Sequence, residues 1–544
     1  MKIIKKKWLL RSLIGLGIFV VAVSIFIFFF LDNIVISKLE SKLENSYGKT
    51  YSIEYKEINY SVLFTSVSIE LKEVEFKTDA DKAEKYKSPI INLESKSISI
   101  EGVSLWDFFL YSELNMNNIF IESPHLSIAR NKEFENEEEP NPEDEKLDIS
   151  KHIKNLMFDE FKITGGSAEF FNDINMKDTL FHLKNFDFKA NNFKSSNENL
   201  SELLIINKYK GLNVKSESFN LNLGEDNYSI YVEKFKGELI KGDLELENIH
   251  FKPPYQSIQS GKEYRSDVKI SKLKLIGVDY ESGDNRSLAA DSAIIKDTDI
   301  DLTKNQALSN KREKTLWMEN LLSLKEQLSI EHLKFQNCSL SSEIQKLGGD
   351  NTYTLKLSNL EGEIENINTD SKSDYLTIRA SSNVFKTGKL KMTVDLPYNS
   401  PQTSTFKGTI SNIDLKSFNG LMIKMYSLKI EEGKLNDLSF EGKTNGDKSE
   451  GSLTFIYDDL KGSFIKESNG KKKPAKLISK LMNMVIYESN PREGEDKPEE
   501  VDFSFTKEKY QGQVMLWLGG IVDGTVITII GKKKHDFLLN QIEE

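Results

Sequence analysis

Apolar and polar residues alternate along most of the chain, and one pattern of alternation recurs. Two apolar residues separated by one polar position are followed by a gap of two polar positions, and then by a second such apolar pair. We call this eight-residue pattern a strand unit. In six strict copies the intervening positions are all polar or glycine. The apolar positions of these copies are Ile69, Leu71, Val74 and Phe76; Ile98, Ile100, Val103 and Leu105; Phe181, Leu183, Phe186 and Phe188; Leu244, Leu246, Ile249 and Phe251; Val268, Ile270, Leu273 and Leu275; and Leu328, Ile330, Leu333 and Phe335.

The spacing of the strand unit favours a strand over a helix. On a helix, offsets of 0, 2, 5 and 7 scatter around the cylinder, so no single helical face buries all four residues. On a strand, each apolar pair lies on one face, and the extra residue in the gap shifts the phase by one. A β-bulge, or a strand that crosses between two layers, would absorb that shift. Leu156, Phe158, Phe161 and Ile163 form a looser seventh copy.

The strand units predict a mainly β protein built on a long antiparallel sheet. One face of that sheet is apolar, and the other is rich in lysine, glutamate, asparagine and serine. The copies are unevenly spaced along the chain, which excludes a solenoid of fixed repeat length. Ordinary half-buried strands of several β-sandwiches would produce the same pattern, so that alternative stays open at this point.

The N-terminus predicts a membrane anchor. Residues 12–31 are twenty residues without a charge, enough to cross a bilayer core about 30 Å thick. The stub at 1–11 carries five positive charges, and Asp32 follows the apolar run, which places the N-terminus in the cytoplasm and the remainder across the membrane. A cleaved signal peptide is the rival interpretation. The run ends in bulky residues without a small-residue cleavage site, so we favour an uncleaved anchor.

Composition also divides the rest of the chain. A short helix is predicted over 34–45, and a second, amphipathic helix over 311–328, with an apolar side formed by Leu316, Met318, Leu321, Leu322 and Leu324. A third helix is predicted over 476–487. The predicted segments are a stub at 1–11, the transmembrane anchor at 12–31, an N-terminal β module at 32–131, an acidic linker with two prolines at 132–148, a central β-rich region at 149–400, a C-terminal module at 401–487, a linker at 488–502 and a C-terminal apolar segment at 503–544.

The apolar run at 514–530 permits more than one structure. Seventeen residues are barely enough to cross a membrane, and Asp523 and three glycines weaken a spanning helix. A packed strand pair or an interfacial amphipathic segment fits the run better. A second span would return the basic C-terminus to the cytoplasm and stays open.

Charge and cysteine content exclude several classes of function. The formal net charge is −11, and since five positive charges lie in the stub, the remainder carries −16. Such a chain is neither a general nucleic-acid binder nor drawn to anionic lipid by its mean charge. A single cysteine, Cys338, excludes a disulfide scaffold and any zinc or redox site built on paired cysteines.

Candidate chemistry is sparse. The six histidines are not spaced as metal ligands, and His182, His250 and His332 fall at polar positions of strand units, which favours a solvated face. The chain has no GxSxG nucleophile motif and no phosphate-binding loop. We therefore expect a protein that is not an enzyme, with no catalytic, metal-binding or cofactor-binding residue.

Two segments resemble a known family. A basic stub, a single anchor, a short helix and a glycine-containing break, YGKTYSIEYKEINYS, lead into strands reading VSIELKEVEF, and this arrangement resembles the start of the AsmA-like family of bacterial envelope proteins, to which TamB is related. The later stretches FKGTISNIDLKSFNGLM and IEEGKLNDLSFEGKTNGDKSEGSLTFIYDDLKGSF resemble the C-terminal module of that family, closing on Tyr457 and Leu460. The resemblance covers about the first 80 and the last 150 residues, and between them the chain matches only in style.

The resemblance implies a fold and a function. Relatives of this kind are thought to be elongated, curved β-grooves that carry phospholipid between the inner and outer membranes of diderm bacteria. The resemblance implies a single-pass inner-membrane protein with a periplasmic body, and a phospholipid ligand held by the apolar strand-unit positions. It also implies a role in outer-membrane homeostasis and a partner that is an outer-membrane or envelope protein. An envelope assembly scaffold without lipid is the second hypothesis, and a membrane-tethered hydrolase the third.

Overall fold

The computed structural model describes residues 51–63, 65–79, 90–111, 113–129, 155–194, 210–222, 228–253, 264–281, 287–305, 313–325, 327–345, 353–370, 374–385, 387–426, 428–468, 471–474 and 486–536. The predicted stub, anchor, 34–45 helix and 132–148 linker, and most of the 476–487 helix, lie outside these residues. The chain forms two compact units, residues 1–246 and 247–544. The division falls within the predicted central region.

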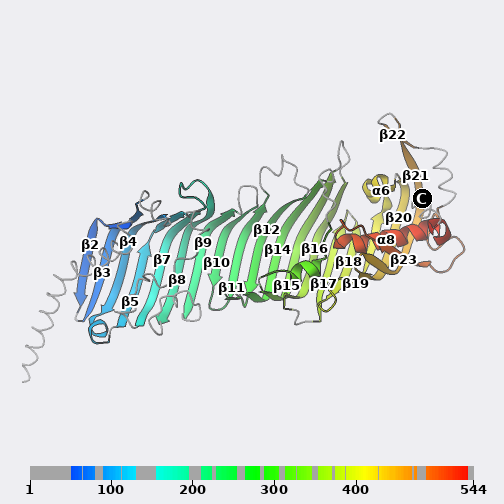
Figure 1. Ribbon diagram of the computed structural model, residues 1–544. Helices are drawn as coiled ribbons and strands as arrows, with labels where there is room; N and C mark the ends of the chain where they lie inside the picture. Colours follow the sequence, from blue (N-terminus) through cyan, green and yellow to red (C-terminus); the bar gives the residue numbers. More distant parts are fainter. Residues whose placement is uncertain are drawn as a thin grey trace, which may run out of the picture. The chain divides into compact units, whose positions relative to one another are not determined.

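Unit 1 is a sheet of successive strands, coloured blue to green in Figure 1. Its elements are β1 (Tyr51–Glu54), β2 (Glu57–Leu63), β3 (Ser66–Thr78), β4 (Ile90–Ser104), the π-helix η2 (Asp107–Tyr111), β5 (Glu113–Glu122), β6 (His125–Ala129), β7 (Asn155–Phe171), β8 (Thr179–Lys194), β9 (Gly211–Asn222) and β10 (Ser229–Glu238). The next strand, β11 (Asp243–Lys252), crosses the boundary between the units.

Unit 2 combines a sheet with three α-helices among its described residues. Its strands are β12 (Tyr264–Ile276), β13 (Asp279–Glu281), β14 (Ser287–Asn305), β15 (Gln327–Gln345), β16 (Tyr353–Asn368), β17 (Tyr375–Val384), β18 (Gly388–Pro397), β19 (Thr403–Asp414), β20 (Leu428–Asn445), β21 (Lys448–Ser468), β22 (Lys471–Pro474) and β23 (Glu500–Thr506). Its helices are α5 (Trp317–Leu322), the 3-10 helix η8 (Leu415–Phe418), α6 (Asn419–Tyr426) and α8 (Gln513–Ile530). The prediction of a mainly β protein is confirmed.

The prediction of a purely antiparallel sheet is wrong at three pairings. β7 pairs parallel with β5 and β6, and β15 pairs parallel with β14. A parallel pair needs a long connection that returns the chain to the starting end of the sheet. More than twenty residues separate Ala129 from Asn155, and Asn305 from Gln327. The sheet is therefore mixed, with antiparallel registers between the other paired strands that the structure describes. The sequence did not predict this, because alternation of apolar and polar residues indicates the two faces of a strand but not its direction.

The predicted change of phase within the strand unit is confirmed, and a left-handed residue produces it. In four of the six copies the second residue of the polar gap has a positive φ: Glu73 (49°), Gly102 (69°), Asn185 (46°) and Asn248 (52°). In the other two, a left-handed residue lies on the neighbouring strand at the level of the gap, Asp297 or Asn366. The register shifts beside Gly102 and beside Asn185, as expected for bulges.

The predicted helix over 311–328 is much shorter than expected. α5 covers six residues, and β15 begins at Gln327. The Glu319 carboxylate accepts a hydrogen bond from the Leu316 backbone N–H at 2.8 Å and so ties down the first turn. Met318 is buried as predicted, whereas Leu324 lies beyond the helix and is exposed.

The apolar run at 514–530 is a helix, so the predicted strand pair is wrong. α8 has 18 residues and, within the described residues, is the one helix long and apolar enough to cross a membrane. One of its faces packs against β21 and β23 (Figure 1). Asp523, the residue that argued against a membrane span, has polar partners in this structure. It accepts a hydrogen bond from the Ser504 backbone N–H at 3.3 Å and lies 2.9 Å from His535 Nε2.

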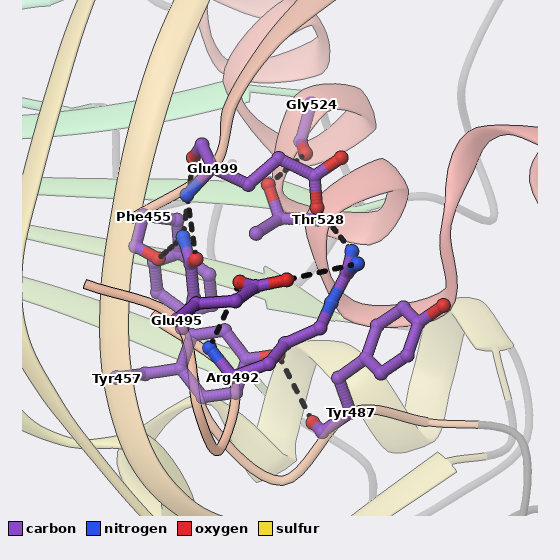
Figure 2. A network of polar contacts seen from close by, with 9 residues as sticks. Phe455, Tyr457, Tyr487, Arg492, Glu495, Glu499, Gly524 and Thr528 are labelled. Atoms are coloured by element: carbon purple, nitrogen blue, oxygen red, sulfur yellow. Dashed lines mark hydrogen bonds and ion pairs between the residues drawn. The ribbon is translucent and has the colours of Figure 1, made fainter. Parts of the chain in front are cut away.

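The segment predicted as the linker 488–502 is held tightly to β21 (Figure 2). Asn490 is 2% exposed, and its Nδ2 donates to the carbonyls of Phe455 at 2.7 Å and Glu499 at 3.2 Å. Its Oδ1 accepts from the Glu499 N–H at 2.8 Å. Beside it, Arg492 stacks over Tyr487, and burial raises the pKa of Tyr457. The buried Asn490 therefore packs this predicted linker against β21, whereas its residues 493–497 are exposed.

Asn490→Ala is expected to destabilise the protein by about 2 kcal/mol, because one buried and two part-buried backbone groups lose a partner. Chemical denaturation of the full chain, followed by tryptophan fluorescence, measures the change. Glu493→Ala, an exposed position of the same segment, is the control and should leave the midpoint unchanged. Equal midpoints for the two variants would contradict the role assigned to Asn490.

Candidate functional site

Apolar side chains in unit 1 form rows that run across the strands. Residues directly opposite each other in neighbouring strands place their side chains on the same face of the sheet. The registers join four such rows. The rows are Ile58, Leu71, Ile98, Ile121, Ile163, Phe188 and Val214; Tyr60, Ile69, Ile100, Ile119, Phe161, Ala190 and Leu212; Ile53, Phe76, Leu93, Leu126, Ala168, Leu183, Phe219 and Val232; and Ile91, Ile128, Phe170, Phe181, Leu221 and Ile230.

The rows belong to one surface, which we call the apolar face of unit 1. Aromatic contacts link members of neighbouring strands, such as Phe161 with Phe188 at 5.7 Å between ring centroids. Phe219 of the third row also contacts Phe235 of β10, at 6.4 Å between ring centroids. On β3 and β8 the left-handed residues Glu73 and Asn185 lie between members of the third row and the first row, so the change of phase keeps both rows on one face.

Most residues of this face are half-buried, although Ala168, Ala190, Leu212 and Val232 are buried. All seven members of the first row are half-buried, in contrast to the core of a closed domain. Small buried clusters do form, and one contains Met116, Phe158, Phe193 and Leu212. Among the described residues, the only helix of unit 1 is η2, which lies in the connection between β4 and β5. The described part of unit 1 thus presents apolar rows without a covering layer.

Unit 2 continues the same construction and then closes it. Two long rows start at Leu273 and at Leu275 on β12 and end at Val501 and at Phe503 on β23. Their first members are half-buried, whereas Phe406, Leu453 and Phe503 at the far end are 2 to 3% exposed. α8 covers this end, and Trp517 of the helix lies 6.5 Å from Phe406 between ring centroids.

The predicted site residues are found in both units. Of the 24 strand-unit positions, all but Val74 and Ile249 are half-buried, and those two are buried. The rows bring together Ile69, Leu71, Phe76, Ile98, Ile100, Phe181, Leu183 and Phe188 in unit 1. Other row members were missed, such as Ile58, Ile121 and Val214, because they lie on strands whose pattern departs from the strict unit.

The opposite face of the sheet carries charged pairs between strands. Lys215 Nζ lies 2.8 Å from Asp187, and this hydrogen bond lowers the pKa of the Asp187 carboxyl group. Arg379 Nη1 lies 2.7 Å from Glu365, which raises the pKa of the guanidinium. Histidines join such pairs, as His182 does with Glu169 at 3.8 Å. In the described part of the chain no group of three or more His, Cys, Asp or Glu could hold a metal ion.

The sheet of each unit is therefore amphipathic, with an apolar face and a charged face. Comparison with protein-family models and with curated proteins finds no match to this chain.

Proposed function

We propose that this chain is a membrane-anchored, AsmA-like envelope protein that binds or passively conducts phospholipid along the apolar faces of its units. The observation that carries the proposal is the set of continuous apolar rows of unit 1, most of whose residues are half-buried. Acyl chains lying on these rows would remove apolar surface from water, while headgroups stay hydrated. The proposal places the body of the protein in the periplasm and the predicted span at 12–31 in the inner membrane.

The dimensions of the rows suit acyl chains. Seven residues on neighbouring strands, at about 4.8 Å per strand, span about 29 Å. One leaflet of a bilayer core about 30 Å thick holds acyl chains over about 15 Å. A single row therefore has room for the full length of a phospholipid acyl chain, and its neighbours two residues away on each strand have room for a second chain.

A photocrosslinking experiment tests the proposal on the full chain in its membrane. Benzoylphenylalanine at Phe188, a half-buried member of the first row, is expected to form a covalent adduct with phospholipid on illumination. The same probe at Tyr231 is the control. This aromatic residue is 43% exposed, and it alternates with Ile230 and Val232 of the apolar rows, so it lies on the other face.

Mass spectrometry of the purified chain identifies the adduct. A phospholipid adduct at position 188, and little at position 231, is the expected result. Absence of lipid at position 188, or equal yields at both positions, would contradict the proposal. Crosslinking of position 188 to a protein would instead support the scaffold hypothesis, in which a partner covers the apolar face.

A further inference from the structure

One end of unit 1 carries a cluster of exposed apolar side chains that the proposed lipid path does not use. Leu63 is 69% exposed, Trp106 57%, Leu110 61% and Tyr111 60%. We call these four residues the tip patch. A monomeric protein rarely leaves several large apolar side chains exposed together, and such a patch marks an interaction site.

The fold brings the two segments of the tip patch to one place. Leu63 is paired with Ser66 at the close of the β2–β3 hairpin. The connection from β4 to η2 starts beside that hairpin, because the Leu105 backbone N–H donates to the Thr65 carbonyl at 2.8 Å. Trp106, Leu110 and Tyr111 follow within this connection, so the four side chains lie at the same end of the strands.

We infer that the tip patch inserts into the interface of a phospholipid bilayer. Tryptophan and tyrosine favour the headgroup level of a membrane, and leucine favours the acyl region just below it. The one acidic residue of η2, Asp107, has polar partners within the protein, since hydrogen bonds from the Ser104 and Asn115 side chains lower its pKa.

The position of the predicted anchor supports a bilayer as the occupant. Residues 32–50 join the predicted span to β1. With the predicted helix over 34–45 contributing about 18 Å and the other residues at most about 25 Å, this connection reaches at most roughly 43 Å. β1 enters the sheet opposite Thr78, at the end of β3 away from the tip patch. The 13 residues of β3 span about 43 Å. The connection is therefore just long enough for the span and the tip patch to lie in the same membrane.

Fluorescence quenching in vesicles tests the inference with the full chain. A nitrobenzoxadiazole fluorophore is attached through Leu110→Cys, or separately through Leu63→Cys, in a Cys338→Ala background. The chain is reconstituted into palmitoyl-oleoyl phosphatidylcholine vesicles with or without nitroxide-labelled phosphatidylcholine. Both tip positions are expected to be quenched at least about twofold by the nitroxide lipid, as for side chains buried below the headgroups. Tyr231→Cys, exposed on the charged face, is the control and should be unaffected.

Each outcome decides the inference. Quenching at positions 63 and 110 alone supports insertion. Absence of quenching at both positions overturns it. A blue-shifted emission without quenching also overturns it, because the patch is then covered by protein, either a partner or a second copy. The result is independent of the lipid path, since benzoylphenylalanine at Phe188 reports on that path separately.

Discussion

The variant Ile98→Asp with Ile100→Asp is expected to reduce the phospholipid adduct at Phe188 by at least about tenfold. These two isoleucines are the third members of the first two rows, opposite Leu71 and Ile69 on one side and Ile121 and Ile119 on the other. A carboxylate beneath an acyl chain loses its hydration without gaining a partner, which costs several kcal/mol. Lipid that enters from the anchored end would have to pass these positions to reach β8.

The control for this variant is a matched double substitution on the other face of the same strand. Ser97→Asp with Ser99→Asp adds the same two charges to the same strand, opposite Lys72 and Glu70. It should leave the adduct at Phe188 unchanged. Circular dichroism checks that both variants keep their strands, which we expect because Ile98 and Ile100 are only half-buried. An adduct that persists at Phe188 in the isoleucine variant would show that β4 lies outside the lipid path.

The strand unit made the fold class predictable because its physical cause is local. A strand must alternate, and a change of phase needs a residue that tolerates a left-handed backbone. The sequence carries that signal too, since the second gap position is glycine or asparagine in several copies, as at Gly102, Asn185 and Asn248. Reading the gap residue together with the apolar pairs would have located further phase changes, such as the one at Asn359.

The features of the fold that the sequence pattern did not predict depend on contacts between distant parts of the chain. The parallel pairing of β14 with β15 depends on the end of the sheet to which the connection from Asn305 to Gln327 returns. The alternation of apolar and polar residues does not indicate that end. The rows of the candidate site depend on register between strands, so a weakly patterned strand such as β2 joins a row only through its partner. The tip patch was missed for a different reason, because the run from Leu105 to Tyr111 has no strand alternation and η2 is too short for a helical period.

α8 shows how a composition argument can miss a tertiary contact. Its glycines weaken a helix in isolation, and this argued against a helix at 514–530. In the folded chain they allow the helix to approach the sheet closely. A Cβ at Gly520 would lie 2.6 Å from Phe503 Cε2, and one at Gly524 would lie 2.6 Å from Leu453 Cδ2. The cost of glycine is therefore offset by packing that only the sheet can supply.

Gly520→Leu is accordingly expected to lower the free energy of unfolding by about 3 kcal/mol, the upper end of the range for overpacked cores. The new side chain has no space between the helix, Phe503 and Ser449, so α8 must move outward. Trp517, which donates to the Ser404 hydroxyl at 3.2 Å, then loses its buried position. Chemical denaturation of the full chain, followed by tryptophan fluorescence, measures the change in stability.

Displacement of α8 should also uncover the far end of the unit 2 rows. Phe406, Leu453 and Phe503 would become accessible, so the variant is expected to bind an apolar dye that the unmodified chain binds less. Val514→Leu adds bulk to an exposed position of the same helix and is the control for both measurements. Unchanged stability and dye binding in the Gly520 variant would mean that α8 does not close this end. Increased dye binding would show that α8 closes the far end of the rows, whose first members on β12 are half-buried.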